Sequence, residues 1–327
     1  ARRKEKKKLA DALVANENVT IFATEDPKYF KKRDMLLSWS IGWAVNRRTA
    51  SNLRIAACRT LSSLVYPYEV VPGLTDRLWK EGVVMRILRY SRRGNLVVHE
   101  HVSFDDVKLG PLVDKGAAGS IHRAGWNGIV VAAKVCSENN VGFQPSEFRF
   151  EVAIMCIFNH PNILPCLGAH CFGPRYMLLS PFKMNGSLQK VLLDKSLKIG
   201  WGRRLMLAMD VASALEYMHS YKVVHRDLKS ANVVVGAEYR AFVTDFGNAR
   251  VIGKHDKRDR EKLIGTTEWM APEMFTEVDK QYTEKIDVYS FGIILYEILT
   301  RTYPYSSLGV KNWQIPDLVI AGERPPL

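Results

Sequence analysis

The sequence lacks long hydrophobic runs and has few cysteines. No apolar segment approaches the roughly 18 residues that a transmembrane helix requires, and the first residues, ARRKEKKKLADALV, contain no apolar stretch typical of a secretion signal. The five cysteines are an odd number without C-x-x-C spacing, which favours buried thiols over disulfides or a zinc site. These absences predict an intracellular, cytoplasmic protein with no membrane span.

The composition excludes a disordered chain. Hydrophobic residues make up 47% and aromatic residues 10% of the 327 residues, as in ordinary globular proteins. The charge is uneven, because residues 1–104 hold 20 Lys and Arg against 10 Asp and Glu and so carry 10 of the net +13. The basic residues are scattered among apolar ones, which favours a solvated helix face. No motif indicates nucleic-acid binding.

Hydrophobic periodicity divides the chain into two regions. Between about residues 9 and 90 the pattern is helical, as in SNLRIAACRTLSSLVY and RLWKEGVVMRILRYSRRGN. These segments loosely resemble armadillo-type helical repeats. We therefore expect an all-α region over residues 1–100 that could bind a protein partner. The period becomes strand-like near residue 96, which predicts a domain boundary within residues 92–105.

The second region predicts an α+β domain. Short apolar runs alternate with glycine-rich turns after residue 105, as in a hairpin sheet. From about Val152 three segments have helical periodicity: VAIMCIF, WGRRLMLAMDVASALEYMHS and KIDVYSFGIILYEILT. This order predicts a small sheet-rich lobe followed by a larger helical lobe, with a ligand cleft expected between the lobes.

The stretch VVHRDLKSANVVV combines several polar side chains with apolar flanks. The flanking valines indicate burial, and buried charges need partners. Asp245 follows in TDFGNAR, and carboxylate and amide oxygens are suitable Mg²⁺ ligands. Upstream, Lys134 lies in the predicted strand VVAAKVC, and Glu151 lies on a predicted helix at a distance that suits an ion pair.

These motifs, in this order and spacing from about Val107 to the last residue, resemble those of the eukaryotic protein kinases. The resemblance implies that Asp227 accepts the proton of the substrate hydroxyl and that Lys229 neutralises the transferred phosphoryl group. It also implies that Asn232 and Asp245 bind Mg²⁺. The predicted kinase domain covers residues 107–327, and its bilobal fold is the α+β arrangement described above.

The same resemblance implies an ATP site. Lys134 would hold the α- and β-phosphates with Glu151 as its helical partner. The other implied nucleotide contacts are Val113, Asp114, Gly116, Gly119, Ile121, Ala132, Ser180, Phe182 and Val234. Ser180 occupies the gatekeeper position before PFKMNG, where a small residue leaves space behind the adenine.

The subgroup is indicated by three further stretches. HRDLKSAN, with a lysine two residues after the aspartate, resembles serine/threonine kinases. GTTEWMAPE and DVYSFGIILYEIL resemble the tyrosine-kinase-like group, whose members mostly phosphorylate Ser and Thr. By the same match, Asp287 should anchor the backbone of the catalytic loop and Thr266 should contact that loop.

The glycine-rich loop departs from the family pattern. Asp114 stands where the first glycine is expected, with Gly116 and Gly119 at the second and third positions. A carboxylate near the phosphates repels them, although Lys115 offsets part of the repulsion. We therefore expect weakened ATP affinity.

The activation segment departs too. Residues 248–265 contain no Ser, Thr or Tyr, so the usual switch by phosphorylation within this loop is absent. Arg226, which binds the loop phosphate in the family, would need another anion. Candidates are Asp256, Asp259 and Glu261. Activity should therefore be insensitive to phosphatase treatment.

The sequence stops at AGERPPL, before the last helices of the family's larger lobe, so that lobe should be less stable than a complete one. Three functions are compatible with the sequence. An active kinase acting on Ser and Thr of protein substrates is favoured, because every catalytic residue is present. The alternatives are a pseudokinase scaffold and a protein-binding module in the N-terminal helices.

Overall fold

The computed structural model describes two compact units. Among the described residues, unit 1 contains 57, 102–116, 119–159, 165–171 and 173–182, and unit 2 contains 160–164, 183–252, 264–276 and 283–326. The residues that the structure describes are 57, 102–116, 119–171, 173–252, 264–276 and 283–326.

Some of the predictions lie outside the described residues. The armadillo-like helices expected within residues 1–100 are among them. So are the three acidic residues proposed as partners of Arg226, namely Asp256, Asp259 and Glu261. These stay predictions.

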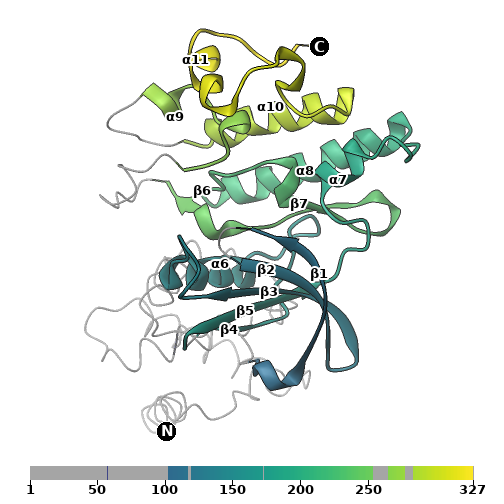
Figure 1. The fold of residues 1–327 in the computed structure, drawn as a ribbon, viewed down its shortest axis with the longest axis vertical. Helices are drawn as coiled ribbons and strands as arrows, with labels where there is room; N and C mark the ends of the chain where they lie inside the picture. Colours follow the sequence, from purple (N-terminus) through teal and green to yellow (C-terminus); the bar gives the residue numbers. More distant parts are fainter. Residues whose placement is uncertain are drawn as a thin grey trace, which may run out of the picture. The chain divides into compact units, whose positions relative to one another are not determined.

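Unit 1 is built on a five-stranded antiparallel sheet with the strand order β1-β2-β3-β5-β4 (Figure 1). The strands are Val107–Lys115 (β1), Gly119–Trp126 (β2), Ile129–Ser137 (β3), Gly168–His170 (β4) and Arg175–Pro181 (β5). Asn127 and Gly128 join β2 to β3 with φ of 48° and 78°. Asn-Gly tolerates these positive angles, and the resulting two-residue turn fixes the register of the hairpin.

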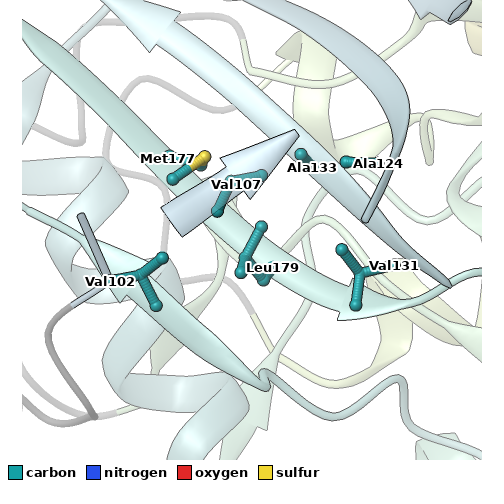
Figure 2. Packing of buried hydrophobic residues seen from close by; sticks show 7 residues of the cluster. All are labelled: Val102, Val107, Ala124, Val131, Ala133, Met177 and Leu179. Carbon is teal, nitrogen blue, oxygen red and sulfur yellow. The ribbon is translucent and has the colours of Figure 1, made fainter. Parts of the chain in front are cut away.

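One face of this sheet is covered by the hydrophobic core of unit 1. Figure 2 shows Val131 and Ala133 of β3 close to Ala124 of β2 and to Met177 and Leu179 of β5. These residues alternate along their strands, as the two-residue period of a strand requires. The full cluster, called the sheet core below, is Val102, Val107, Ala124, Val131, Ala133, Met177 and Leu179.

Helix α6, Pro145–Ile157, lies in unit 1. It begins with a proline in its first turn, where the missing N–H costs no helical hydrogen bond. From Phe150 to Ile157 every residue is buried, including Glu151. A carboxylate in such an apolar helix needs a partner of opposite charge.

Unit 2 is mainly helical. Its α-helices are Leu188–Leu193 (α7), Trp201–Ser220 (α8), Glu273–Thr276 (α9), Lys285–Thr300 (α10) and Ile315–Ile320 (α11). Helices α8 and α10 coincide with two of the segments predicted from periodicity. The oxygen of the Ser187 side chain accepts a hydrogen bond from the Lys190 N–H at 3.3 Å and so caps α7.

Two small antiparallel sheets in unit 2 carry the loops between the helices. Strand β6 (Val223–Val224) pairs with β9 (Arg250–Val251), and β7 (Val233–Val235) pairs with β8 (Ala241–Val243). The valines on either side of HRDLKSAN therefore form strands.

Helix α10 combines an apolar surface with three buried polar side chains. Ile294 and Ile298 are 0% and 2% exposed, and Asp287, Ser290 and Glu297 are at most 7% exposed. Buried polar groups are stable only when they are hydrogen-bonded. The partners of these three side chains determine how neighbouring loops are held.

The fold confirms the α+β prediction, because a sheet-rich part precedes a helical part. The four cysteines in the described residues, Cys136, Cys156, Cys166 and Cys171, are free and buried, as expected. Burial raises the pKa of Cys171 to about 12, so this thiol is unreactive at neutral pH. None of the helices that the structure describes is both long and apolar enough to span a membrane.

Candidate active site

Lys134 and Glu151 form an ion pair within unit 1. Lys134 is in β3 and Glu151 is in α6, and Lys134 Nζ lies 2.8 Å from Glu151 Oε1 and 2.9 Å from Oε2. The side chain of Glu151 is 4% exposed and that of Lys134 is 24% exposed. The pair therefore fixes the direction of a lysine that solvent and ligands still reach. The ion pair expected from the sequence is confirmed.

Four predicted nucleotide contacts share the sheet face opposite the sheet core. Ile121 pairs with Lys134 across β2 and β3, and Ala132 pairs with Ser180 across β3 and β5. Directly paired residues in antiparallel strands lie on the same face, and successive residues alternate between faces. Three strands thus bring these four side chains onto one surface.

The glycine-rich hairpin is described at residues 114–116, at and just after the end of β1, and at residues 119–121, at the start of β2. The Gly116 N–H donates to the Gly119 carbonyl oxygen at 2.9 Å, and Asp114 Oδ1 accepts from the Lys115 N–H at 2.9 Å. A Cβ on Gly119 would lie 2.3 Å from the Val135 carbonyl oxygen, whereas a Cβ on Gly116 would have no neighbour within 4 Å. Close packing therefore demands glycine only at position 119.

The two remaining predicted nucleotide contacts in unit 1 are Val113 and Phe182. Val113 is in the register break between Leu112 and Asp114 and is 38% exposed. Phe182 has the guanidinium of Arg123 over its ring, at 5.9 Å from the ring centroid. Arg123 pairs with Ala132 and so shares the face of Ile121. It was not predicted, although the two-residue period along β2 points to it.

In unit 2, Asp287 of α10 anchors the HRD loop, residues 225–232. Its Oδ2 accepts from the His225 N–H at 2.8 Å, and its Oδ1 accepts from the Arg226 N–H at 3.0 Å. His219 Nε2 lies 2.9 Å from the same Oδ2. Arg226 has a φ of 70°, which is rare for a residue with a side chain. The buried carboxylate stabilises this turn, and the anchor predicted at Asp287 is confirmed.

The Asp227 side chain is in contact with Thr266, Lys229 and Asn232. Thr266 Oγ1 donates to Asp227 Oδ1 at 2.8 Å, and Lys229 Nζ lies 3.3 Å from Asp227 Oδ2. Lys229 Nζ also donates to Thr266 Oγ1 at 2.6 Å. Asn232 Nδ2 donates to the Asp227 carbonyl oxygen at 2.8 Å. The predicted catalytic residues of the loop are thus in contact, and Thr266 contacts the loop as expected.

Asp245 follows β8 and is tied to the HRD loop through its neighbours. The Thr244 N–H donates to the Asn232 carbonyl oxygen at 3.0 Å, and the Thr244 carbonyl oxygen lies 3.0 Å from His225 Nε2. The backbone of Asp245 is in the left-handed helical region, with φ 66° and ψ 66°. Aspartate tolerates this conformation better than most residues do. The ring of the buried Phe246 lies 5.2 Å from that of His225.

Asn232 and Asp245 fit a magnesium ion by their chemistry. The Asn232 amide nitrogen is occupied by the Asp227 carbonyl, so its oxygen is the group available to a cation. Mg²⁺ typically binds one or two carboxylates together with phosphate oxygens and water. The described residues contain no cluster of three or more His, Cys, Asp or Glu that could hold a metal by itself. A cation here would therefore be shared with a phosphate ligand.

The predicted site residues fall into two groups, one in each unit. The group in unit 1 is Val113, Asp114, Gly116, Gly119, Ile121, Ala132, Lys134, Glu151, Ser180 and Phe182. The group in unit 2 is Asp227, Lys229, Asn232, Val234 and Asp245. Val234 lies in β7, half-buried, opposite Phe242.

A buried glutamate beside the HRD loop was not predicted. Glu297 of α10 is 1% exposed; its Oε1 accepts from Ser230 Oγ at 2.6 Å and its Oε2 from Trp269 Nε1 at 2.9 Å. Burial raises the pKa of Glu297 from 4.5 to about 7, although both hydrogen bonds lower it. The available signal was a charged residue within the apolar helix KIDVYSFGIILYEILT.

Comparison with known proteins gives a consistent result. The family model described as protein tyrosine and serine/threonine kinase matches residues 107–327. The chain is 39% identical over 236 residues to the RGS domain-containing serine/threonine-protein kinase A of Dictyostelium discoideum, covering 72% of this chain and 20% of that protein. It is 37% identical over 208 residues to the serine/threonine-protein kinase CTR1 of Arabidopsis thaliana, covering 62% of this chain and 25% of that protein. The chain thus spans a quarter or less of these relatives.

Proposed function

The chain belongs to the family of protein tyrosine and serine/threonine kinases, and on this premise we propose that it transfers the γ-phosphate of ATP to Ser and Thr hydroxyls of protein substrates. The observation that carries the proposal is the contact of Asp227 with Lys229 and Thr266 in unit 2. A carboxylate held in this way can orient a hydroxyl without changing its own position.

Asp227 acts as the base in the proposed reaction. The substrate hydroxyl oxygen attacks the γ-phosphorus, the bond from that phosphorus to the β–γ bridging oxygen breaks, and ADP leaves. The hydroxyl proton passes to Asp227. Lys229, 3.3 Å from that carboxylate, balances negative charge on the transferred group. Because little covalent work falls to the protein, positioning and charge neutralisation account for most of the rate.

Unit 1 supplies the proposed nucleotide-binding surface. Lys134, directed by Glu151, contacts the α- and β-phosphates. The glycine-rich hairpin covers the phosphates with backbone N–H groups, at Gly116 and Gly119 above all. The adenine lies against Ile121 and Ala132 and against Ser180 and Phe182, which all belong to unit 1. The shared sheet face of these residues supports this assignment.

Asn232 and Asp245 are the proposed Mg²⁺ ligands. When bound, the ion neutralises the phosphates and fixes their orientation. The contribution of this chain is to hold the two oxygen donors still: Asn232 through its bond to the Asp227 carbonyl, and Asp245 through the bonds of Thr244 to the HRD loop.

The subgroup and the domain limits are part of the proposal. HRDLKSAN and GTTEWMAPE support the tyrosine-kinase-like group and a preference for Ser and Thr, and the names of both relatives contain "serine/threonine-protein kinase". We assign residues 107–327 to the kinase domain and residues 1–100 to a helical region that contacts a protein partner. An intracellular location follows from this activity, because ATP and most phosphorylated proteins are intracellular.

The deciding experiment is transfer of labelled γ-phosphate from Mg²⁺-ATP by the full chain to peptides that differ only in a Ser, Thr or Tyr acceptor. Asp227→Asn is the control, since it removes the base but keeps the size of the side chain. We expect transfer to Ser and Thr, and a fall of about 10²- to 10⁴-fold in the variant. ATP affinity should be the same in both proteins.

Three outcomes would contradict the proposal in whole or in part. If both proteins bind ATP and neither transfers phosphate, the chain is a pseudokinase. Equal transfer by Asp227→Asn would remove Asp227 from the mechanism. Transfer confined to tyrosine would overturn the assignment of the acceptor alone.

A further inference from the structure

Glu297 closes a ring of contacts around the proposed base. One of its oxygens binds Ser230 of the HRD loop and the other binds Trp269, three residues after Thr266. The Trp269 N–H donates to the Thr266 carbonyl oxygen at 2.9 Å, and Thr266 Oγ1 donates to Asp227 at 2.8 Å. The chain from Asp227 to Ser230 completes the ring.

We propose that Glu297 is a positioning residue for phosphoryl transfer, which fixes the HRD loop and the segment 265–269 against each other so that Asp227 and Thr266 stay in contact. The inference rests on the proposed function. It adds a second anchor to the one at Asp287. The two carboxylates are ten residues apart on α10, about 15 Å along the helix, and they hold opposite ends of the HRD loop.

The position of Ser230 makes this anchor specific. Ser230 begins a short 3-10 helix, Ser230–Asn232, and directly follows Lys229. Lys229 contacts Asp227, and Asn232 donates to the Asp227 carbonyl oxygen. A shift of Ser230 would therefore move both neighbours relative to the carboxylate. Displacement of a catalytic group by about 1 Å can reduce a rate by about 10²-fold.

Each segment has other hydrogen bonds within unit 2, so loss of Glu297 should loosen the segments without unfolding the unit. Asp287 holds the start of the HRD loop. Ser290 Oγ donates to the Trp269 carbonyl oxygen at 2.7 Å, and Tyr303 Oη donates to Glu268 Oε1 at 2.9 Å. Among these contacts, only Glu297 is bonded to both segments.

The test compares Glu297→Leu with Glu297→Gln. Glutamine keeps both contacts, because its oxygen accepts from Trp269 and its nitrogen donates to the Ser230 hydroxyl; leucine keeps neither. We expect kcat to fall by about ten- to a hundred-fold in Glu297→Leu and by less than about threefold in Glu297→Gln. The KM for ATP should change by less than about twofold in both, since the nucleotide-binding surface is not altered.

Ile298→Val is the matched control. It lies next to Glu297 on the same buried helix and is 2% exposed, so it lowers stability without removing a hydrogen bond. It should leave kcat unchanged. A loss of rate in Ile298→Val equal to that in Glu297→Leu, or a Gln variant as slow as the Leu variant, would overturn the proposal.

Hydrogen exchange separates this inference from the proposed function, because it requires no transfer activity. Backbone amides of residues 225–232 and 264–269 should exchange faster in Glu297→Leu than in the Gln and control variants. Should Glu297→Leu not fold, Ser230→Ala and Trp269→Phe each break one bond, and each should speed exchange in the other segment as well as its own. Changes confined to the mutated segment would refute the coupling, whether or not the wild-type chain transfers phosphate.

Discussion

The HRD loop and the glycine-rich hairpin are held in opposite ways. In the HRD loop, His225 and Ser230 are fully buried, and each is bonded to a buried carboxylate of α10. In the hairpin, Asp114 and Ile121 are exposed. In the described part of its turn, the Gly116 N–H donates to the Gly119 carbonyl oxygen. The HRD loop is thus held by buried side chains of α10, whereas the turn of the hairpin is held by a bond within its own backbone.

This difference matches what each loop would do in the proposed reaction. A base and its neighbouring cation must be in place before the hydroxyl arrives, because reorganisation during the reaction costs rate. A phosphate cover uses backbone N–H groups, and its geometry is completed by the ligand. The HRD loop should therefore be sensitive to its buried partners, and the hairpin mainly to the space around its backbone.

The largest effect should come from Asp287→Asn. The asparagine amide has the size of the carboxylate. In the wild type, however, both carboxylate oxygens accept a backbone hydrogen bond, and the amide has only one oxygen. The buried N–H groups of His225 and Arg226 therefore cannot both be satisfied in the variant. We expect a loss of about 4 kcal/mol in the free energy of unfolding. The rate should fall by about 10²-fold, because the turn at Arg226 relaxes.

Chemical denaturation and phosphate transfer check this prediction. Asp210→Asn is a suitable comparison, since Asp210 is a buried carboxylate of α8 that binds Arg240 and the Ala241 N–H. Asp210→Asn should lower the free energy of unfolding, but it should reduce the rate of phosphate transfer less than Asp287→Asn does. Equal losses of rate in the two variants would contradict the special role of Asp287.

A second prediction concerns the pH dependence of stability through Glu297. The pKa of Glu297 is raised from 4.5 to about 7 by burial, so between these values the folded protein holds a proton that the unfolded chain releases. The bound proton stabilises the folded state. This contribution to the free energy of unfolding is fully present below about pH 4.5 and is lost as the pH rises through about 7. It amounts to about 3 kcal/mol at most.

Glu297→Gln cannot ionise and should lack this pH dependence. The difference in unfolding free energy between wild type and variant, measured by denaturation from pH 5 to pH 8, should shift in favour of the variant as the pH rises. A constant difference would show that the pKa of Glu297 is the same in the folded and unfolded states. A shift in favour of the wild type would show that folding lowers this pKa, and either result would contradict the prediction.

The same two loops show what could be predicted from the sequence. The HRD loop and its anchor at Asp287 were predicted because motif order and spacing along the chain fix them. The contacts of Glu297 could not be predicted, since they join α10 to residues 67 and 28 positions away and depend on how helices pack. Arg123 was missed although the two-residue period along β2 places it on the same face as Ile121; its contact with Phe182 could not be predicted, because it depends on how the segment after β5 lies against β2.

In the hairpin, Gly119→Ala should lower the free energy of unfolding by an intermediate amount, and Gly116→Ala should hardly change it. A methyl group at position 119 would meet the Val135 carbonyl oxygen at 2.3 Å, so β2 and β3 must separate, whereas at position 116 nothing lies within 4 Å. Overpacking of this kind costs about 1–3 kcal/mol. Thermal unfolding of both variants measures it, and equal stability would show that the hairpin adapts without cost.

The smallest effect should come from the charge of Asp114. Its carboxylate is exposed and accepts from the Lys115 N–H, so its repulsion of phosphate is screened by water and salt. Asp114→Gly and Asp114→Asn should both lower the ATP dissociation constant by about two- to fivefold at low salt, in line with a charge effect of about 1 kcal/mol or less. Both gains should shrink as salt is added. Asparagine removes the charge and keeps the shape, so a gain seen only with glycine would mean that the backbone, and not the charge, limits ATP binding at the hairpin. An unchanged dissociation constant in both variants would show that Asp114 does not face the phosphates.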